Sequence, residues 1–294
     1  MTAINIMSLR HSAFYTPLLV CISGGFLKEQ GLEPHYEIQT PERTVVDTIR
    51  SGETHVAQSA VATSFAALEA AEDIDIVHFA QINERDGFFL AGRETDAEFD
   101  WSRLIGREVL VDHFFQPLAM FKYALHLKGV AFDDIRVVDA GDVAAIDQAF
   151  RHGQGDFVHQ QGPAPQQLEK DGLGHVVASI GEVVGPVAFS SLCADREWLA
   201  TDMARAFMQA YRKARQFTID APAAELARLL ENFFPAIEQT VLSDTLQTYQ
   251  QLGCWTPDPV ISQAAYDNLL AVFLHSGAIS RPHPYSAAII SPPA

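Results

Sequence analysis

Two short stretches of the chain place hydrogen-bonding side chains directly after a predicted strand. Residues 55–58 form the first strand, and Ser59 and Thr63 follow it at a predicted helix N-terminus. Hydroxyls beside free backbone N–H groups suit a carboxylate, sulfonate or phosphate, although Ser59 is also explained as an ordinary N-cap. Residues 156–159 form the second predicted strand, of which His159 is the last residue, and Gln160 follows it directly. An imidazole and an amide can each donate to and accept from a small polar ligand.

Two loops combine polar and aromatic residues after predicted strands 3–9 and 105–111. Ligands of open α/β sheets bind at the carboxyl ends of the strands. We therefore expect these loops to supply hydrogen bonds and stacking rings, the alternative being solvated loop residues. The candidates are Arg10, His11, Phe14 and Tyr15 in the first loop and His113, Phe114 and Gln116 in the second.

Three further candidates lie near predicted crossings between two halves of the chain. Asn83 and Arg85 follow predicted strand 75–79, and Arg85 can pair with an anionic ligand or simply with Asp86. Glu182 lies near a predicted return crossing and could accept a hydrogen bond from a ligand amine.

Spacing argues against several other chemistries. The chain has 11 histidines, but none is spaced as HxxxH or HExxH, so we expect no metal site. It contains no GxSxG elbow of a serine hydrolase. The 3 cysteines, Cys21, Cys193 and Cys254, are far apart and form no CxxC pair. We expect no disulfide framework and no cofactor.

Composition limits the classes of partner that the chain can bind. The chain has 294 residues, 48% of them hydrophobic, and a formal charge of −17. Such acidity argues against nucleic acid and anionic membrane surfaces, although it leaves room for a small anion held by local donors. No uninterrupted apolar run is long enough to span a membrane. We expect a protein that binds a small molecule and is a monomer or a weak dimer.

The order of elements predicts an α/β protein. Strands alternate with helices to about residue 192, and helices dominate from Trp198 onward, which indicates mostly parallel sheets and a helical C-terminal third. The two helix–turn–strand units align, with Gly52 matching Gly153 and Val56 matching Phe157. Any two such units look alike, so this is either coincidence or a sign of two similar lobes. The expected boundaries are 1–92 with 186–294 for lobe one and 93–185 for lobe two.

Several longer segments resemble a known family. They are FYTPLLVCISGGFLKEQGLEPHYE from Phe14, VVDTIRSGETHVAQSA from Val45, LIGREVLVDH from Leu104 and AFRHGQGDFVH from Ala149. Together they resemble the substrate-binding proteins of nitrate, sulfonate and taurine type ABC importers, a superfamily that includes the pyrimidine synthases of thiamine biosynthesis. The resemblance implies a two-lobe type II periplasmic-binding-protein fold that closes on its ligand at a hinge. It also implies an ABC permease and an ATPase as partners.

The enzymes of this superfamily carry catalytic residues that differ from the residues of this chain. At the positions where the resemblance places the lysine and histidine of the pyrimidine synthases, this chain has Ser59 and Thr63. Their cysteine cluster is missing. The nucleophilic cysteine of related desulfinases would fall near Ser12, and Cys21 lies too far into the next helix. We expect a binder without catalytic residues. The alternatives are an enzyme on this fold, such as a pyrimidine synthase, decarboxylase or desulfinase, and a cytoplasmic ligand sensor.

Two ligand classes and two locations stay open. The aromatic residues Phe14, Tyr15, Phe114 and Phe115 favour a planar, pyrimidine-like heterocycle, whereas Ser59 favours a sulfonate or carboxylate. The N-terminus shows no secretory signal as written. We expect a cytoplasmic protein if Met1 is the true start, and a periplasmic or membrane-associated one if a signal was trimmed.

Overall fold

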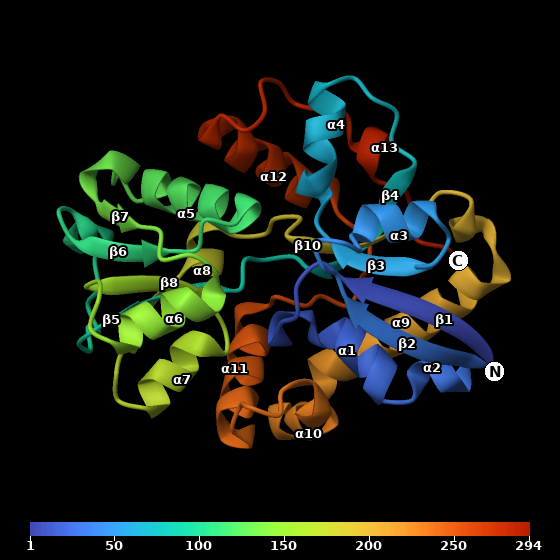
Figure 1. Cartoon of the computed structure of the whole chain (residues 1–294), viewed down its shortest axis with the longest axis horizontal. Helices are drawn as coiled ribbons and strands as arrows, with labels where there is room; N and C mark the ends of the chain where they lie inside the picture. Colours follow the sequence, from blue (N-terminus) through green and yellow to red (C-terminus); the bar gives the residue numbers. More distant parts are fainter.

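The computed structural model describes all 294 residues, which form two α/β lobes (Figure 1). The sheet of lobe one contains β1 (Thr2–Ser8), β2 (Leu32–Ile38), β3 (Val56–Ser59), β4 (Ile76–Asn83) and β10 (Ser190–Asp195). Its order is β2-β1-β3-β10-β4. β1 pairs in parallel with β2 and β3, whereas β10 is antiparallel to β3 and β4.

The sheet of lobe two repeats this topology. It contains β5 (Phe88–Gly92), β6 (Glu108–Val111), β7 (Arg136–Val138), β8 (Phe157–Gln161) and β9 (His175–Ser179), in the order β7-β6-β8-β5-β9. β6 is parallel to β7 and β8, and β5 is antiparallel to β8 and β9. In each sheet three neighbouring strands are parallel, and one strand makes the antiparallel pairs, β10 in lobe one and β5 in lobe two. We call β10 and β5 the exchanged strands, because the chain enters each of them from the other lobe.

The similarity between the two helix–turn–strand units reflects this repeated topology. Gln58 of β3 lies opposite Ser8, the last residue of β1, and His159 of β8 lies opposite Val111, the last residue of β6. The glycines before both strands have positive φ, 76° at Gly52 and 91° at Gly153, a region that suits glycine because it has no Cβ. Gln58 and His159 therefore occupy equivalent places in the two lobes.

The exchanged strands correct one expected boundary. We predicted that lobe one extends to residue 92, but β5 pairs with β8 and β9 and so belongs to the sheet of lobe two. The first crossing therefore lies before Phe88. The chain returns before β10, which enters the sheet of lobe one from the opposite direction to its neighbours. This reversal makes both exchanged strands antiparallel and leaves the remaining strands parallel.

Thirteen α-helices cover the sheets. Lobe one has α1 (Thr16–Ser23), α2 (Phe26–Glu29), α3 (Val45–Arg50) and α4 (Phe65–Glu69), and lobe two has α5 (Phe115–Leu127), α6 (Val143–Arg151), α7 (Ala164–Lys170) and α8 (Ile180–Val184). The helical C-terminal third contains α9 (Asp202–Asp220), α10 (Ala223–Leu229), α11 (Gln239–Leu252), α12 (Gln263–Ser276) and α13 (Tyr285–Ala288). None of the helices is both long and apolar enough to cross a membrane.

Local sequence explains where several helices begin and end. Thr44, Asp142 and Ser262 cap α3, α6 and α12 by accepting hydrogen bonds from backbone N–H groups of the first turn. α1 and α2 are separate helices, because Gly25 between them adopts a φ of 82°. Ser59 is the last residue of β3 rather than an N-cap, and a 3-10 turn over Val61–Ser64 precedes the short α4.

The C-terminal helices brace both lobes. An apolar core of 66 buried residues runs through the two sheets, so the lobes are joined by packing as well as by the chain crossings. α11 supplies Tyr249, whose hydroxyl donates to the carbonyl oxygens of Gly87 and Gly162 at 3.0 and 3.3 Å. Phe115 of α5 contacts Phe273 of α12, with ring centroids 4.9 Å apart. In Figure 1, α11 and α12 both lie beside the junction of the lobes.

The two chain crossings touch each other at Gly181. A Cβ atom at this position would lie 2.2 Å from the carbonyl oxygen of Asp86, far inside van der Waals contact. Arg85 reinforces the contact by donating from Nη1 to the carbonyl oxygen of Gly181 at 3.1 Å. Glycine is therefore required where α8 meets the first crossing.

We expect Gly181→Ala to lower the free energy of unfolding by about 1–3 kcal/mol, the usual cost of overpacking a tight contact. The carbonyl oxygen of Asp86 belongs to the backbone, so it cannot swing away as a side chain would. Urea denaturation followed by circular dichroism measures the change. Glu182→Ala, at an exposed position of the same helix, is the matched control and should be neutral. Equal stability of the two variants would contradict the proposed contact.

Candidate functional site

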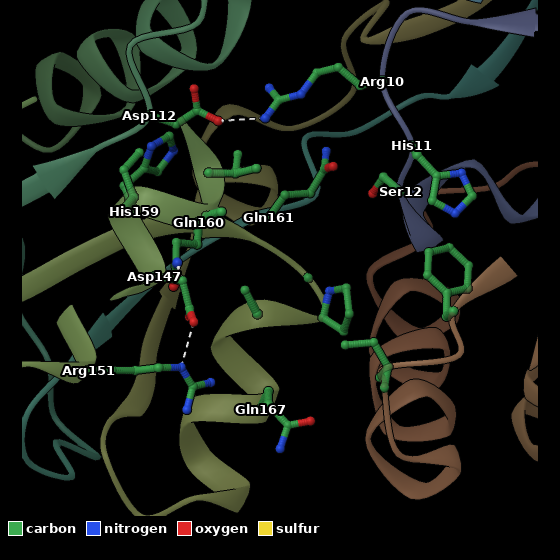
Figure 2. Close-up of a pocket in the computed structure, with 18 residues that line it drawn as sticks. Arg10, His11, Ser12, Asp112, Asp147, Arg151, His159, Gln160, Gln161 and Gln167 are labelled. Carbon is green, nitrogen blue, oxygen red and sulfur yellow. Dashed lines mark hydrogen bonds and ion pairs between the residues drawn. The ribbon is translucent and has the colours of Figure 1, made fainter. Parts of the chain in front are cut away.

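A cavity of about 530 Å³ lies between the lobes, beyond the carboxyl ends of β1, β6 and β8 (Figure 2). Lobe one contributes the loop after β1 and the segment before α11. Lobe two contributes Asp112 after β6, the end of β8, one side of α6 and the start of α7. The lining residues are Arg10, His11, Ser12, Asp112, Val143, Ala144, Ile146, Asp147, Arg151, His159, Gln160, Gln161, Gly162, Pro163, Ala164, Gln167, Phe234 and Ile237. The position agrees with ligand sites of open α/β sheets.

Arg10 connects the lobes across this cavity. Its Nη2 lies 3.0 Å from Oδ2 of Asp112, and its Cζ lies 4.9 Å from the ring centroid of Phe114. The two charged side chains are only 23% and 7% exposed, so water screens the pair incompletely. On its own lobe, the backbone N–H of Arg10 donates to Oε1 of Gln58 at 3.3 Å. Arg10 thus joins the first loop of lobe one to the first loop of lobe two.

The second arginine of the cavity is also paired. Nε of Arg151 lies 2.5 Å from Oδ2 of Asp147, and its Nη1 lies 2.6 Å from Oδ2 of Asp171. Desolvation alone would lower the pKa of Arg151, but the hydrogen bonds and opposite charges of Asp171 and Asp147 together outweigh it and raise this pKa. Gln160 donates from Nε2 to Oδ1 of Asp147 at 3.4 Å, and its Oε1 is buried without a partner. Neither cation of the cavity is free.

His159 is held rigidly between two aromatic rings. Its ring centroid lies 4.7 Å from those of Phe88 and Phe121, with interplanar angles of 23° and 26°. Both ring nitrogens are buried without a hydrogen-bond partner. Burial lowers the pKa of His159 to about 3, so the imidazole is neutral and offers one donor and one acceptor. Figure 2 shows His159 next to Asp112.

More polar groups are buried around the chain crossings. Burial raises the pKa of the buried Tyr15 hydroxyl, and the positive charge of Arg10 partly opposes this increase. Gln116 donates from Nε2 to the carbonyl oxygen of Phe189, but its Oε1 has no partner. Buried polar atoms are rarely left without partners, so this cluster has unused capacity for hydrogen bonds.

Asp86 is the most perturbed acid of this cluster. Its Oδ1 accepts from the backbone N–H of Phe88 at 2.7 Å, and its Oδ2 is buried without a partner. Burial raises the pKa of Asp86 to about 8, and the negative charge of Asp112 adds to the increase. The carboxyl is therefore largely protonated near neutral pH and can donate from one oxygen.

The aromatic candidates separate into core and surface. Phe14 is fully buried, with its ring centroid 4.8 Å from that of Tyr249 and 5.6 Å from that of Phe189, so no face is free to stack on a ligand. Phe114 is 45% exposed beside Arg10, and Phe115 packs against α12. None of the three lines the cavity.

His11 lines the cavity, but its ring is already occupied. Nε2 lies 2.9 Å from the carbonyl oxygen of Phe233, and Nδ1 lies 3.1 Å from the hydroxyl of Tyr36. The ring also stacks on Phe234 at a centroid distance of 4.7 Å. His11 therefore fixes the loop to the C-terminal helices.

The other candidates lie outside the lining. The hydroxyls of Ser59 and Thr63 are 3.3 Å apart, and Thr63 donates to the carbonyl oxygen of Ala60. Without an N-cap at Ser59, the predicted anion site at that helix terminus has no structural basis. The remaining four are held by protein contacts or face solvent: Asn83 donates to the carbonyl oxygen of Phe14, Arg85 to that of Gly181, His113 lies 2.8 Å from that of Val111, and Glu182 is exposed.

Sequence reasoning missed several lining residues. The sequence did indicate Asp112 as a candidate position, because this residue follows predicted strand 105–111 directly. Asp147 and Arg151 are spaced as an i,i+4 ion pair of a helix, which is normally a solvated surface feature. Phe234 and Ile237 come from the distant C-terminal third, and no local pattern indicates that this segment reaches the cavity.

The elevated pKa of Asp86 predicts a specific pH dependence. The unfolded chain releases this proton near the ordinary value of 3.8, whereas the folded chain keeps it to about pH 8. The contribution of Asp86 to stability is therefore full below about pH 4 and is lost as the pH rises to about 8. Asp86→Asn removes this loss, so its stability relative to wild type should increase between about pH 5 and about pH 9. Urea denaturation of both proteins at these pH values provides the test, and parallel pH profiles would contradict it.

Comparisons with known proteins agree with this architecture. The family model described as NMT1/THI5 like matches residues 13–225. "Putative binding protein YtlA" of Bacillus subtilis (strain 168) is 28% identical over 296 residues, which cover 98% of this chain and 88% of that protein. The alkanesulfonate-binding protein SsuA from Xanthomonas axonopodis pv. citri, bound to MOPS, superposes with a TM-score of 0.74 at 14% identity, covering 99% of both chains.

A second solved structure has the same fold. It is the ligand-binding component of an ABC-type import system from Staphylococcus aureus, with zinc bound, and it gives a TM-score of 0.74 at 15% identity, covering 99% of this chain and 97% of that one. The two-lobe fold of periplasmic binding proteins, expected from the resemblance, is confirmed. With most of its length matched by the family model, the chain belongs to the NMT1/THI5-like family.

Proposed function

We propose that this protein is the solute-binding component of an ABC-type importer and captures a small organic molecule between its lobes. The observation that carries the proposal is a cavity lined from both lobes and spanned by the Arg10–Asp112 ion pair. A ligand in such a cavity contacts both lobes only when they are close, so it stabilises the closed arrangement by its differential affinity. The family and the folds of its structural relatives support the same function.

The ligand that fits these surroundings is a neutral nitrogen heterocycle rather than a small anion. Both arginines of the cavity are paired with carboxylates, so an anion would have to displace Asp112 or Asp147. The groups with unused capacity are neutral, among them the imidazole of His159 and the amide oxygen of Gln160. Such groups suit ring N–H and carbonyl groups.

A sulfonate is the competing ligand class, because the Xanthomonas relative is an alkanesulfonate-binding protein. At 14% identity that likeness concerns the fold, so the charge arrangement of this chain carries more weight. An enzymatic function has less support. Cys21 is fully buried, and burial raises the pKa of its thiol, which makes it a poor nucleophile.

A ligand panel measured by thermal shift tests the proposed class. We expect cytosine, uracil or a related heterocycle to raise the melting temperature with the logarithm of its concentration, because a ligand that binds only the folded state stabilises it by mass action. Taurine, methanesulfonate and nitrate are the matched anions and should produce no shift. A response to the anions alone would contradict the ligand class. Chemical conversion of a bound compound during prolonged incubation would favour an enzyme over a binder.

The partners and the place of action follow from the proposed function. An import receptor delivers its ligand to a permease driven by an ATPase, so it must act on the outer side of the membrane. We expect cells that express the gene from its native upstream region to carry the protein in the extracytoplasmic or membrane fraction. Immunoblotting of fractionated cells measures this. Protein confined to the cytosol would favour the alternative of a cytoplasmic sensor.

A further inference from the structure

Several buried polar atoms near the lobe junction have no hydrogen-bond partner. They are Nδ1 and Nε2 of His159, Oε1 of Gln116 and Oδ2 of Asp86. These side chains are 0–4% exposed, so they are nine-tenths or more buried. Leaving one such atom unpaired costs about 1–3 kcal/mol, which makes several together at one place hard to explain by packing alone.

These groups surround the Arg10–Asp112 ion pair. The charges of Asp112 and Arg10 act on the pKa of His159, and the charge of Asp112 acts on the pKa of Asp86. The charges of Arg10, Asp112 and Asp86 all act on the pKa of Tyr15. Gln116 lies on the first turn of α5, directly after the loop that carries Asp112. The charges of the ion pair therefore act on His159 and Asp86, and Gln116 follows the loop that carries Asp112. Figure 2 shows His159 next to Asp112.

His159 shows how the ion pair restricts access. It lines the cavity, yet its side chain has no exposed surface. Phe88 and Phe121 cover the two faces of the ring, so only the edge of the ring is left for a ligand. The residues with charge next to that ring, Arg10 and Asp112, come from opposite lobes.

We propose that the Arg10–Asp112 ion pair is a gate over a second, inner part of the binding site, in which His159 determines ligand specificity. When the lobes move apart, Arg10 leaves Asp112 and Phe114, and the edge of the His159 ring becomes accessible from the cavity. When they close, the pair re-forms and isolates the inner groups from water. This inference rests on the proposed function for the identity of the ligand, but not for the existence of the gate.

The inner groups define the chemistry that they can recognise. The imidazole is neutral, the carboxyl of Asp86 is largely protonated near neutral pH, and the amide of Gln116 carries no charge. Asp112, the charged neighbour, is neutralised by Arg10. The inner site therefore suits an uncharged planar group with both donors and acceptors, such as an amide or a pyrimidinone edge, because a buried ion would have no counter-charge.

Chemical labelling of His159 tests the gate without any ligand. Diethyl pyrocarbonate modifies accessible neutral imidazoles, and peptide mass spectrometry gives the rate at each histidine. We expect Arg10→Met and Asp112→Asn each to speed labelling of His159 about fivefold, the order expected for the loss of one partly exposed ion pair. Asn still accepts from the backbone N–H of Phe114, as Oδ1 of Asp112 does, so the loop keeps its turn. Arg10→Lys should restore slow labelling in part.

Two controls isolate the effect. Arg50→Met removes the exposed Arg50–Asp75 pair within lobe one and should leave the labelling of His159 unchanged. His152 is exposed and should be labelled equally in all variants. In the wild type, raising the salt concentration from about 0.05 M to about 1 M should also speed labelling of His159, because salt weakens the ion pair. This measurement needs no variant to fold.

The outcomes separate the gate from the proposed function. Unchanged labelling of His159 in Arg10→Met and Asp112→Asn, or no effect of salt on the wild type, would overturn the gate whatever the protein binds. Faster labelling supports the gate even if no heterocycle shifts the melting temperature, in which case the proposed ligand class fails alone. If cytosine binds, it should protect His159 from labelling in the wild type. Bound cytosine that leaves His159 unprotected would overturn the role of this residue in specificity.

Discussion

The structure depends on the double passage of the chain between its lobes. β5 and β10 each follow a strand of one sheet and enter the other, so the two crossings lie next to each other at the lobe junction. Their backbones touch where Gly181 meets Asp86. Arg85 donates a hydrogen bond to the carbonyl oxygen of Gly181, and Tyr249 donates one to the carbonyl oxygen of Gly87, next to Asp86. The loops that end β1, β6 and β8 are placed by these sheets, and so they converge on one cavity. Any movement of the lobes must bend the chain at these few residues.

Desolvation at this junction sets the charge of the groups around the cavity. The same burial that raises the pKa of Asp86 to about 8 lowers that of His159 to about 3, and both shifts favour the neutral form. The Arg10–Asp112 pair keeps its charges because the two ions neutralise each other and are partly exposed. The interior therefore offers hydrogen bonds without net charge, although the whole chain carries −17. Local desolvation, rather than the net charge of the chain, therefore sets the protonation of Asp86 and His159.

The sequence predicted the fold more completely than the site. Periodicity indicated an α/β protein, because the alternation of strands and helices is a local feature. The matching helix–turn–strand units left coincidence or two similar lobes open, and the family resemblance implied the two-lobe fold. The strand exchange was placed too late, at residue 92, since β5 is apolar and would suit either sheet. Arg10, His11, His159 and Gln160 line the cavity as loop and strand-end positions suggested. Phe14 does not, because it packs against Phe189, just before β10, and against Tyr249 of α11, and no local pattern predicts these contacts. Tertiary packing decides which groups a side chain contacts, and these contacts cannot be inferred from the spacing of residues along the chain.

The two lobes use equivalent positions for different purposes. Gln58 and His159 occupy the same place in matching strands, but Gln58 is satisfied within lobe one, since Oε1 accepts from Arg10 and Nε2 donates to the carbonyl oxygen of Ser59. His159 has no such partner in lobe two. Lobe one thus uses Gln58 to hold the backbone of the loop that carries Arg10, whereas both ring nitrogens of His159 in lobe two have no hydrogen-bond partner. The repeated topology therefore presents two different side chains at this position, one that fixes a loop of its own lobe and one whose hydrogen-bonding capacity is unused.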